Sequence, residues 1–137
     1  MNKEWKEFKK KILNNNFLLI TAENPDGEPK DKIFNQKQNL SLEKDLKEFE
    51  FIKVIGWYKN NKENSFLVFG IDLESTEKLR EKYNQKSVTF SDGEDIYRIY
   101  KDSKEKLKDI KFYNKKPEKD FYTEIKIGGE IKYFVAN

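Results

Sequence analysis

The chain has 137 residues, the usual size of one domain, and it contains neither cysteine nor histidine. Disulfides, Cys/His zinc sites and catalytic triads that use histidine are therefore excluded, so any catalysis must use carboxylates, lysine, tyrosine or a carboxylate-bound Mg²⁺ or Ca²⁺. Charged residues make up 39% of the chain but leave a net charge of only +3, and Arg80 and Arg98 are the only arginines. This composition gives no electrostatic prior for nucleic acid or membranes, and it makes sequence-specific DNA binding unexpected.

The first segment, Asn2 to Leu13, has the pattern of an amphipathic helix. Trp5, Phe8 and Ile12 recur at helical spacing with lysines between them. This charged start lacks the apolar centre of a signal peptide, and no apolar run approaches the ~20 residues that span a bilayer. We therefore expect a soluble, cytoplasmic protein without a membrane partner. Its richness in Lys, Asn and Ile is typical of an A/T-rich bacterial or phage genome.

The middle of the chain alternates between strand and helix patterns. The apolar run over 16–22 predicts an interior strand, and a loop with Pro25, Gly27 and Pro29 follows it. The next elements are a helix whose apolar face carries Leu42, Leu46 and Phe49, strands over 51–58 and 65–71, a helix capped by Asp72 that carries Thr76, Leu79 and Tyr83, and a strand over 87–92.

This order of elements predicts an α+β fold of the ferredoxin-like split β-α-β type, with an N-terminal helix and extra C-terminal β-strands. The antiparallel sheet has the order 4-1-3-2, so its first strand pairs with its third. We expect a single domain over 1–137, with an α+β core at 16–93 and a strand-rich extension at 94–137. Apolar residues occur on both faces of the two central strands. Both faces are therefore expected to be covered, which argues against an RNA-recognition module.

Gly128 and Gly129 predict a hairpin near the C-terminus. A strict two-residue turn places Ile125 opposite Lys132. A register slipped by one residue pairs Ile127 with Ile131, and we favour it because it matches the apolar pattern better.

A cluster of neutral polar side chains is predicted at one edge of the sheet. Asn35 and Asn39 share the helix face of Leu42 and Leu46, so their amides point inward, where an unpaired polar group costs ~1–3 kcal/mol. In the predicted topology the end of the first strand, the start of this helix, the start of the third strand and the end of the next helix meet at one edge. We predict a ligand-binding rim without catalytic residues, metal or cofactor, made of Thr21, Asn24, Asn35, Asn39, Tyr58, Ser65, Gln85 and Lys86.

Two plainer interpretations of this region stay open. Asn and Thr side chains often bond backbone groups, so the amides have a structural alternative in which they only tie down the 23–34 loop. The acidic residues of that loop lack the spacing and the glycine of an EF-hand, and we interpret them as a solvated loop. They are Glu23, Asp26, Glu28 and Asp31.

Several motifs resemble the bacterial DUF3293 family. They are ITAENP at 20–25, the pair Asn35 and Asn39 before Asp45-Leu46, ENSFLVFGI at 63–71, and Gln85 at the end of the next helix. The resemblance covers about Asn16 to Gly93 and implies a shared fold and a shared site position, without a reaction. Members of the family often carry an aromatic residue in place of Glu23 and alanine in place of Ser87, so the rim differs from theirs at these positions.

From these patterns we expect a non-enzymatic binding module whose ligand is a nucleotide or a similar small polar molecule. Asn and Gln side chains offer both a donor and an acceptor, which suits the edges of nucleobases. Two alternatives stay open. One is a phage- or mobile-element-encoded protein that inhibits a bacterial defence system, of the anti-defence or anti-CRISPR type, by binding a protein partner or a nucleotide. The other is a carboxylate-dependent enzyme that uses Glu63 or Glu23.

Overall fold

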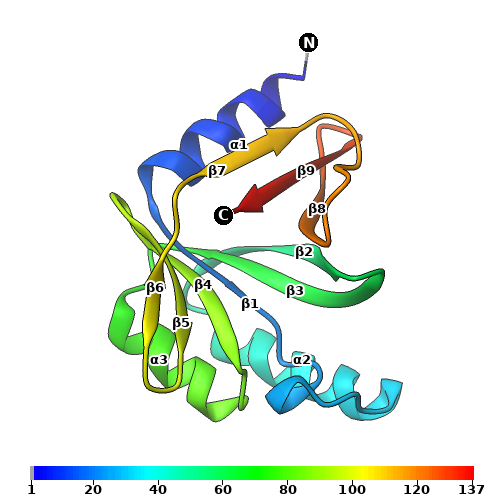
Figure 1. The fold of residues 1–137 in the computed structure, drawn as a ribbon, viewed down its shortest axis with the longest axis vertical. Coiled ribbons are helices and arrows are strands. Elements are labelled where there is room, and N and C mark those ends of the chain that lie inside the picture. The colour runs from blue at the N-terminus through cyan, green and yellow to red at the C-terminus, as the bar shows by residue number, and fades with distance from the viewer. Residues whose placement is uncertain (1) are drawn as a thin grey trace.

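A computed structural model describes residues 2–137 and shows nine strands. They are β1 (Asn16–Ile20), β2 (Glu50–Tyr58), β3 (Asn61–Phe69), β4 (Ser87–Asp92), β5 (Ile96–Tyr100), β6 (Lys104–Lys106), β7 (Ile110–Tyr113), β8 (Phe121–Ile127) and β9 (Glu130–Ala136). They form one antiparallel sheet with the order β6-β5-β4-β1-β3-β2-β8-β9-β7, which curls into a half-barrel (Figure 1).

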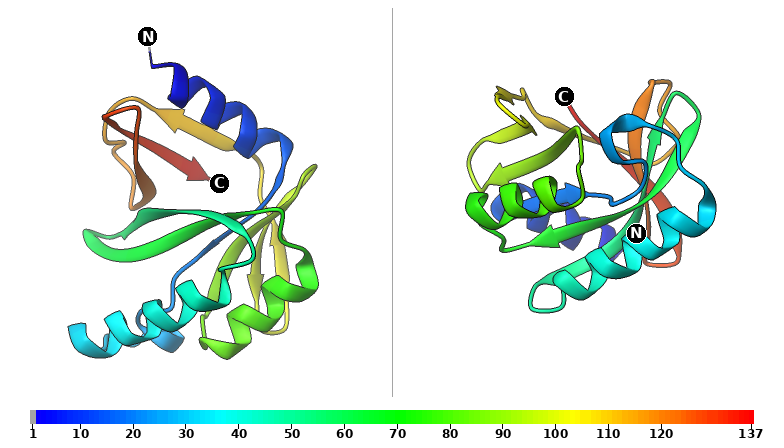
Figure 2. Two further views of the ribbon diagram at one scale, coloured as in Figure 1. Left: turned by 180° about the vertical axis from the view of Figure 1, so that it is seen from behind. Right: turned by 90° about the horizontal axis from the view of Figure 1, so that it is seen from below.

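The helices cover the two faces of this sheet. Helix α1 (Lys3–Asn14) lies on one face, and α2 (Lys32–Asp45) and α3 (Leu73–Lys82) pack on the other (Figures 1 and 2). A short 3-10 turn, η1 (Pro25–Gly27), stands between β1 and α2. Each helix begins at a residue whose side chain accepts a hydrogen bond from the backbone three residues on; these caps are Asn2, Asp31 and Asp72.

Two hydrophobic clusters, one on each face, hold the layers together. The stripe of α1 formed by Trp5, Phe8 and Ile12 packs on Phe17 of β1 and on other side chains of that face. On the opposite face Leu42 and Leu46 pack against side chains from both central strands, together with Leu79 and Tyr83. The burial of four predicted core residues, Leu42, Leu46, Leu79 and Tyr83, and the covering of both sheet faces are therefore confirmed, whereas Phe49 packs against this cluster but is only partly buried.

The two edges of the sheet are brought close by a short connection. The edge strands β6 and β7 are separated in the chain only by residues 107–109. Within this connection the Leu107 amide donates to the Ile96 carbonyl at 2.7 Å, and the Asn137 amide donates to the Asp109 carbonyl at 2.9 Å. The connection therefore fastens β5 on one side to the end of the chain after β9 on the other.

The predicted fold class is wrong, although part of the strand order is right. The order β4-β1-β3-β2 and the pairing of β1 with β3 are confirmed. However, the C-terminal strands do not extend a four-stranded ferredoxin-like unit: β5 and β6 continue the sheet beyond β4, while β8, β9 and β7 continue it beyond β2. A twisted sheet of this size curls, so the fold is a mostly-β half-barrel with three helices and is not a ferredoxin-like α+β fold.

Two turns also differ from their predictions. The β2–β3 turn consists only of Lys59 and Asn60, with φ of 47° and 67°, so β3 begins four residues before the predicted strand start at residue 65. The Gly128-Gly129 turn has φ of 57° and 76° and pairs Ile127 with Glu130. The favoured slipped register was wrong, because a tight two-residue turn fixes the strict register regardless of the apolar pattern.

Leu46→Ala is expected to lower the free energy of unfolding by ~2–5 kcal/mol, because the side chain is fully buried between α2 and the sheet. The matched control is Leu40→Ala on the outer face of the same helix, where the side chain is 60% exposed; this change should stay within about 0.5 kcal/mol. Urea denaturation of both variants measures the difference. Equal losses in the two variants would contradict the packing described above.

Candidate functional site

The amide of Asn39 joins three segments at the end of β1. Its Oδ1 accepts a hydrogen bond from the Ala22 backbone N–H at 2.9 Å, and its Nδ2 donates to the Asn64 carbonyl at 2.9 Å. The same Nδ2 donates to Glu23 Oε2 at 3.1 Å. Helix α2 is thus tied to the chain that leaves β1 and to the middle of β3, and the predicted position of Asn39 against 21–25 is confirmed.

A second amide, that of Asn35, holds the loop that follows. Asn35 Oδ1 accepts from the Asn24 backbone N–H, and Asn35 Nδ2 donates to Asn24 Oδ1, both at 2.9 Å. Asn24 and Asp26 have φ of 48° and 59°, in the left-handed region that residues with a Cβ rarely adopt. The paired amides therefore stabilise a loop conformation that is unfavourable on its own.

The connection between α3 and β4 closes the other side of the loop. Gln85 Nε2 donates to the Glu23 carbonyl at 3.1 Å and to the Tyr83 carbonyl at 3.2 Å. The Asp26 backbone N–H donates to the Asn84 carbonyl at 2.7 Å. Gln85 is 92% buried, so its amide is a structural tie between α3 and the β1–α2 loop.

Two carboxylates stand inside this frame of amides. Glu23 is only 9% exposed, and its Oε2 accepts from the Asn64 backbone N–H as well as from Asn39. The half-buried Glu63 accepts from Asn24 Nδ2 at 2.8 Å. The interpretation of Glu23 as part of a solvated acidic loop was wrong, because the amides draw its side chain inward.

The environment of Glu63 makes its side chain harder to ionise than that of a solvated glutamate. Burial raises the pKa of Glu63 and the neighbouring charge of Glu23 raises it further, although the hydrogen bond from Asn24 lowers it; the net shift of the pKa is upward. Neither Oε1 atom, of Glu23 or of Glu63, is hydrogen-bonded within residues 2–137. These two oxygens are the open acceptors of the site.

The structure brings most of the predicted rim residues together. Thr21 Oγ1 donates to the Asn64 carbonyl at 2.7 Å, and Ser65 Oγ donates to the Glu63 carbonyl at 3.2 Å. Lys86 is exposed and its side chain lies beside Gly27 of the loop. Tyr58 stands apart at the end of β2, exposed, with the Lys59 ammonium 5.4 Å from its ring.

Glu23 and Glu63 were not among the predicted rim residues. One sequence feature could have indicated them. In the predicted topology the motif ENS at 63–65 lies at the same sheet edge as ITAENP, which places Glu63 and Glu23 at that edge. The asparagines, in contrast, satisfy one another and the backbone. They form the frame of the site, and the carboxylates supply its free acceptors.

A separate polar cluster links α2 to α3 on the outer side. The Tyr83 hydroxyl donates to Asp45 Oδ2 at 2.5 Å, Lys82 Nζ donates to the same atom at 2.7 Å, and Ser41 bonds the Tyr83 hydroxyl at 2.9 Å. Desolvation raises the pKa of Asp45, but hydrogen bonds from Lys82 and Tyr83 and the charge of Lys82 outweigh it and lower the pKa overall. Burial and the bond to Asp45 raise the pKa of Tyr83. The phenol therefore stays protonated at neutral pH, and the cluster fastens α2, which carries Asn39, to the end of α3, just before Gln85.

Fold and site together define a mostly-β half-barrel protein with two carboxylates held in a frame of amides at one sheet edge. The chain belongs to the DUF3293 family, described as a protein of unknown function, whose family model matches residues 20–88. This confirms the resemblance of its motifs, and the matched segment contains both carboxylates and all the amides of the frame. A comparison with curated proteins gave no match. Within residues 2–137, no helix is long and apolar enough to cross a membrane.

Asn39→Ala is expected to destabilise the fold by ~1–3 kcal/mol, because it leaves the Ala22 N–H and the Asn64 carbonyl without their side-chain partner. Gln36→Ala, at an exposed position of the same helix, is the control and should change the stability by less than about 0.5 kcal/mol. Chemical denaturation measures both. An Asn39→Ala protein as stable as the control would show that the amide frame does not hold the loop.

Proposed function

We propose that this protein is a non-enzymatic binding module that recognises a nucleotide or a similar small polar ligand at the edge formed by Glu23, Asn24 and Glu63. The observation that carries the proposal is the pair of carboxylates, Glu23 and Glu63, held by amides through one oxygen each, with the pKa of Glu63 raised by burial and by the charge of Glu23. Groups whose pKa is shifted by burial and by a like charge are concentrated at functional sites.

The pKa shift means that Glu63 disfavours folding at neutral pH. Because its pKa is raised in the folded state, the folded protein holds this proton more tightly than the unfolded chain does. The stabilisation that the protonated Glu63 side chain contributes is therefore present below pH 4.5, its ordinary pKa. It is lost as the pH rises through the pKa of Glu63 in the folded protein. A carboxylate kept at this position against stability supports a role in binding.

The free acceptors indicate which ligand edge suits the site. Carboxylate oxygens accept hydrogen bonds from N–H groups, and a guanine-type edge presents adjacent ring and amino N–H donors. Two acids repel a phosphate, so the phosphate of a bound nucleotide must lie away from them. Lys86 is exposed and its side chain lies beside Gly27 of the loop, so it suits that role.

Glu63→Gln tests the proposal because it should raise the stability of the protein and lower its affinity for the ligand. The amide keeps an acceptor for Asn24 but has no charge to bury, so the melting temperature should rise at pH 7, and the gain should vanish near pH ~4. Affinity for a bound guanosine nucleotide should fall at least ~10-fold by calorimetry, because the amide that keeps its oxygen toward Asn24 places an NH2 donor where the wild type has a free carboxylate acceptor. Glu48→Gln, at an exposed position, should change neither quantity.

The screen that precedes this test uses the wild-type protein with nucleosides, mononucleotides and signalling dinucleotides in a thermal-shift assay. Stabilisation by none of them at saturating concentration would contradict the proposal. Turnover of a nucleotide that disappears in Glu63→Gln would instead place the protein among carboxylate-dependent enzymes.

One observation favours a protein partner as the second candidate function. On the outer face of α2 the side chains of Ile33 and Leu40 are 66% and 60% exposed, and Phe34 is 38% exposed. Apolar side chains on the helix that frames the site suit a protein contact, such as that of an inhibitor of a defence system. Binding through this face does not depend on Glu63, so the Glu63→Gln protein also separates the two candidates.

A further inference from the structure

A polar hollow lies at the other end of the molecule, where the N-terminus of α1 meets the β8–β9 hairpin (Figure 1). It has a volume of about 770 Å³, within the range of small-molecule sites. Its lining residues come from three places: the first two turns of α1, the hairpin, and Asn114 just after β7. They are Asn2, Glu4, Trp5, Lys6, Lys9, Asn114, Gly128, Glu130 and Lys132.

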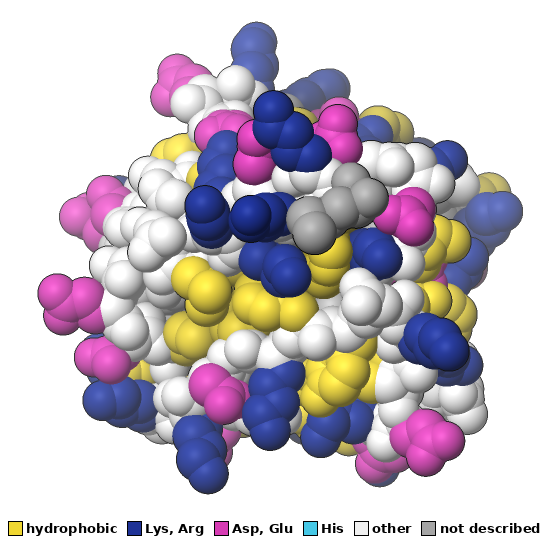
Figure 3. Space-filling model, turned by 90° about the horizontal axis from the view of Figure 1, so that it is seen from above, with side chains coloured by type: hydrophobic (Ala, Val, Ile, Leu, Met, Phe, Trp, Pro, Cys, Tyr) yellow, Lys and Arg dark blue, Asp and Glu magenta, His cyan; other side chains and the backbone are white. Residues whose placement is uncertain are grey.

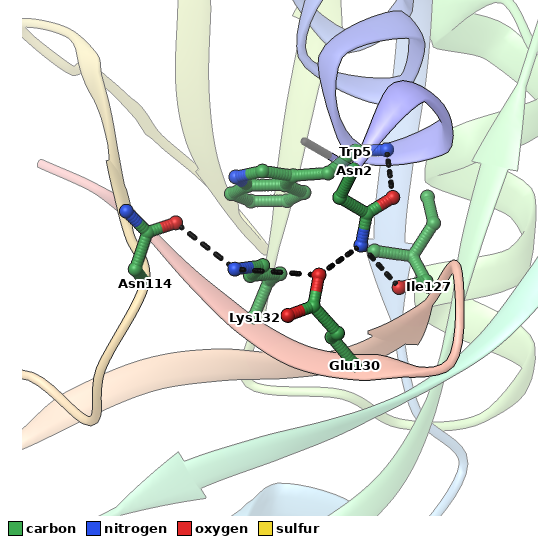
Figure 4. A network of polar contacts seen from close by, with 6 residues as sticks. All are labelled: Asn2, Trp5, Asn114, Ile127, Glu130 and Lys132. Atoms are coloured by element: carbon green, nitrogen blue, oxygen red, sulfur yellow. Dashed lines mark hydrogen bonds and ion pairs between the residues drawn. The ribbon is translucent and has the colours of Figure 1, made fainter.

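The shape of the hollow is fixed by Asn2 (Figure 4). Its Oδ1 caps α1 by accepting from the Trp5 backbone N–H at 3.0 Å, and its Nδ2 donates to the Ile127 carbonyl at 2.9 Å and to Glu130 Oε1 at 2.7 Å. The hairpin turn leaves room for this side chain only because residue 128 is glycine: a Cβ there would stand 2.2 Å from Asn2 Oδ1. The helix and the hairpin are therefore locked together around the hollow.

Trp5 makes one wall of the hollow rigid. Its ring stacks on Phe8 with centroids 5.6 Å apart and meets Phe112 edge-on at the same distance. Only 6% of Trp5 is exposed, so the aromatic wall is anchored in the core.

Lys132 is the least expected group in the hollow. Its side chain is only 12% exposed, yet within residues 2–137 its ammonium has only a long ion pair, to Glu130 Oε1 at 3.9 Å, and a hydrogen bond to a neutral acceptor, Asn114 Oδ1, at 3.2 Å (Figure 4). A charge removed from water normally requires a closely paired counter-charge. The ammonium is therefore positioned to accept a closer anion.

The charged residues around Lys132 also favour an anionic ligand. Lys6 and Lys9 also line the hollow, against the two acids Glu4 and Glu130, and the Lys9 ammonium lies 5.5 Å from the Trp5 ring centroid. On the face seen from above, basic side chains gather near the centre, beside hydrophobic side chains (Figure 3). Lysine ammonium groups bind phosphate oxygens, whereas carboxylates accept hydrogen bonds from hydroxyl groups.

We propose that this hollow binds a small phosphorylated polyol, with its phosphate on Lys132, Lys6 and Lys9 and its hydroxyl groups on Glu130 and Glu4. The mixture of cations and acids favours this ligand over a plain polyanion, because a nucleic-acid backbone has no use for the two carboxylates. The site does not rest on the function proposed above: its residues lie outside 20–88, the segment that matches the family.

The test titrates the full-length protein with glycerol 3-phosphate and inorganic phosphate at constant ionic strength while following the two tryptophan indole N–H signals by NMR. The Trp5 signal should shift in a saturable manner. The Trp57 signal should not, because that indole donates to Glu124 on β8 and does not line the hollow. Lys132→Met, which keeps the length of the buried stem, should weaken the binding of both ligands at least ~10-fold, and Lys47→Met, at an exposed position, should leave it unchanged.

Tighter binding of glycerol 3-phosphate than of inorganic phosphate, reduced to parity in Glu130→Gln, would support the assignment of the hydroxyl groups. The proposal would be overturned by the absence of saturation up to ~10 mM ligand. Equal binding in the Lys132→Met and Lys47→Met proteins would also overturn it. An unchanged Trp57 signal shows that the Lys132→Met protein is folded. The proposal would also be overturned if the wild type and this folded variant bound an oligonucleotide equally well and neither bound glycerol 3-phosphate.

Discussion

The hydrogen bonds of the Asn39 amide are the contacts on which the candidate site depends. One side chain joins Ala22 just after β1, Asn64 of β3 and helix α2. The same amide holds Glu23 Oε2, so it also decides that this acid turns inward. The attachment of α2 to the sheet edge and the inward turn of Glu23 follow from one polar group placed on the apolar face of a helix.

The amides thus hold two acids close together at a cost in folding stability. Hydrogen bonds from Asn39, Asn24 and the Asn64 backbone stabilise the carboxylates, but these bonds use only one oxygen of each acid. The remaining repulsion and burial appear in the raised pKa of Glu63. In the hollow beside α1 the mostly buried Lys132 has only a long ion pair, to Glu130 at 3.9 Å.

The position of the amide cluster was predictable from the sequence, whereas the fold class was not. Helical spacing placed Asn39 on the face of Leu42 and Leu46, and that face has to pack on the sheet. No local pattern tells whether later strands add to one edge or to both, and here the short 107–109 connection carries the chain from one edge strand to the other. The burial of Glu23 could not be predicted either. Its hydrogen-bond partners come from distant segments of the chain, and an acid in a polar loop is normally expected to be exposed to solvent.

The most direct measurement is the pKa of Glu63, obtained by following its side-chain carboxyl carbon with NMR as the pH is changed. In the wild-type protein this pKa should lie above its ordinary value of 4.5, and it should fall in Glu23→Gln, because the neighbouring negative charge is removed while an acceptor for Asn39 is kept. A wild-type pKa at or below 4.5, or a value that does not change in Glu23→Gln, would show that the two carboxylates do not form a coupled site.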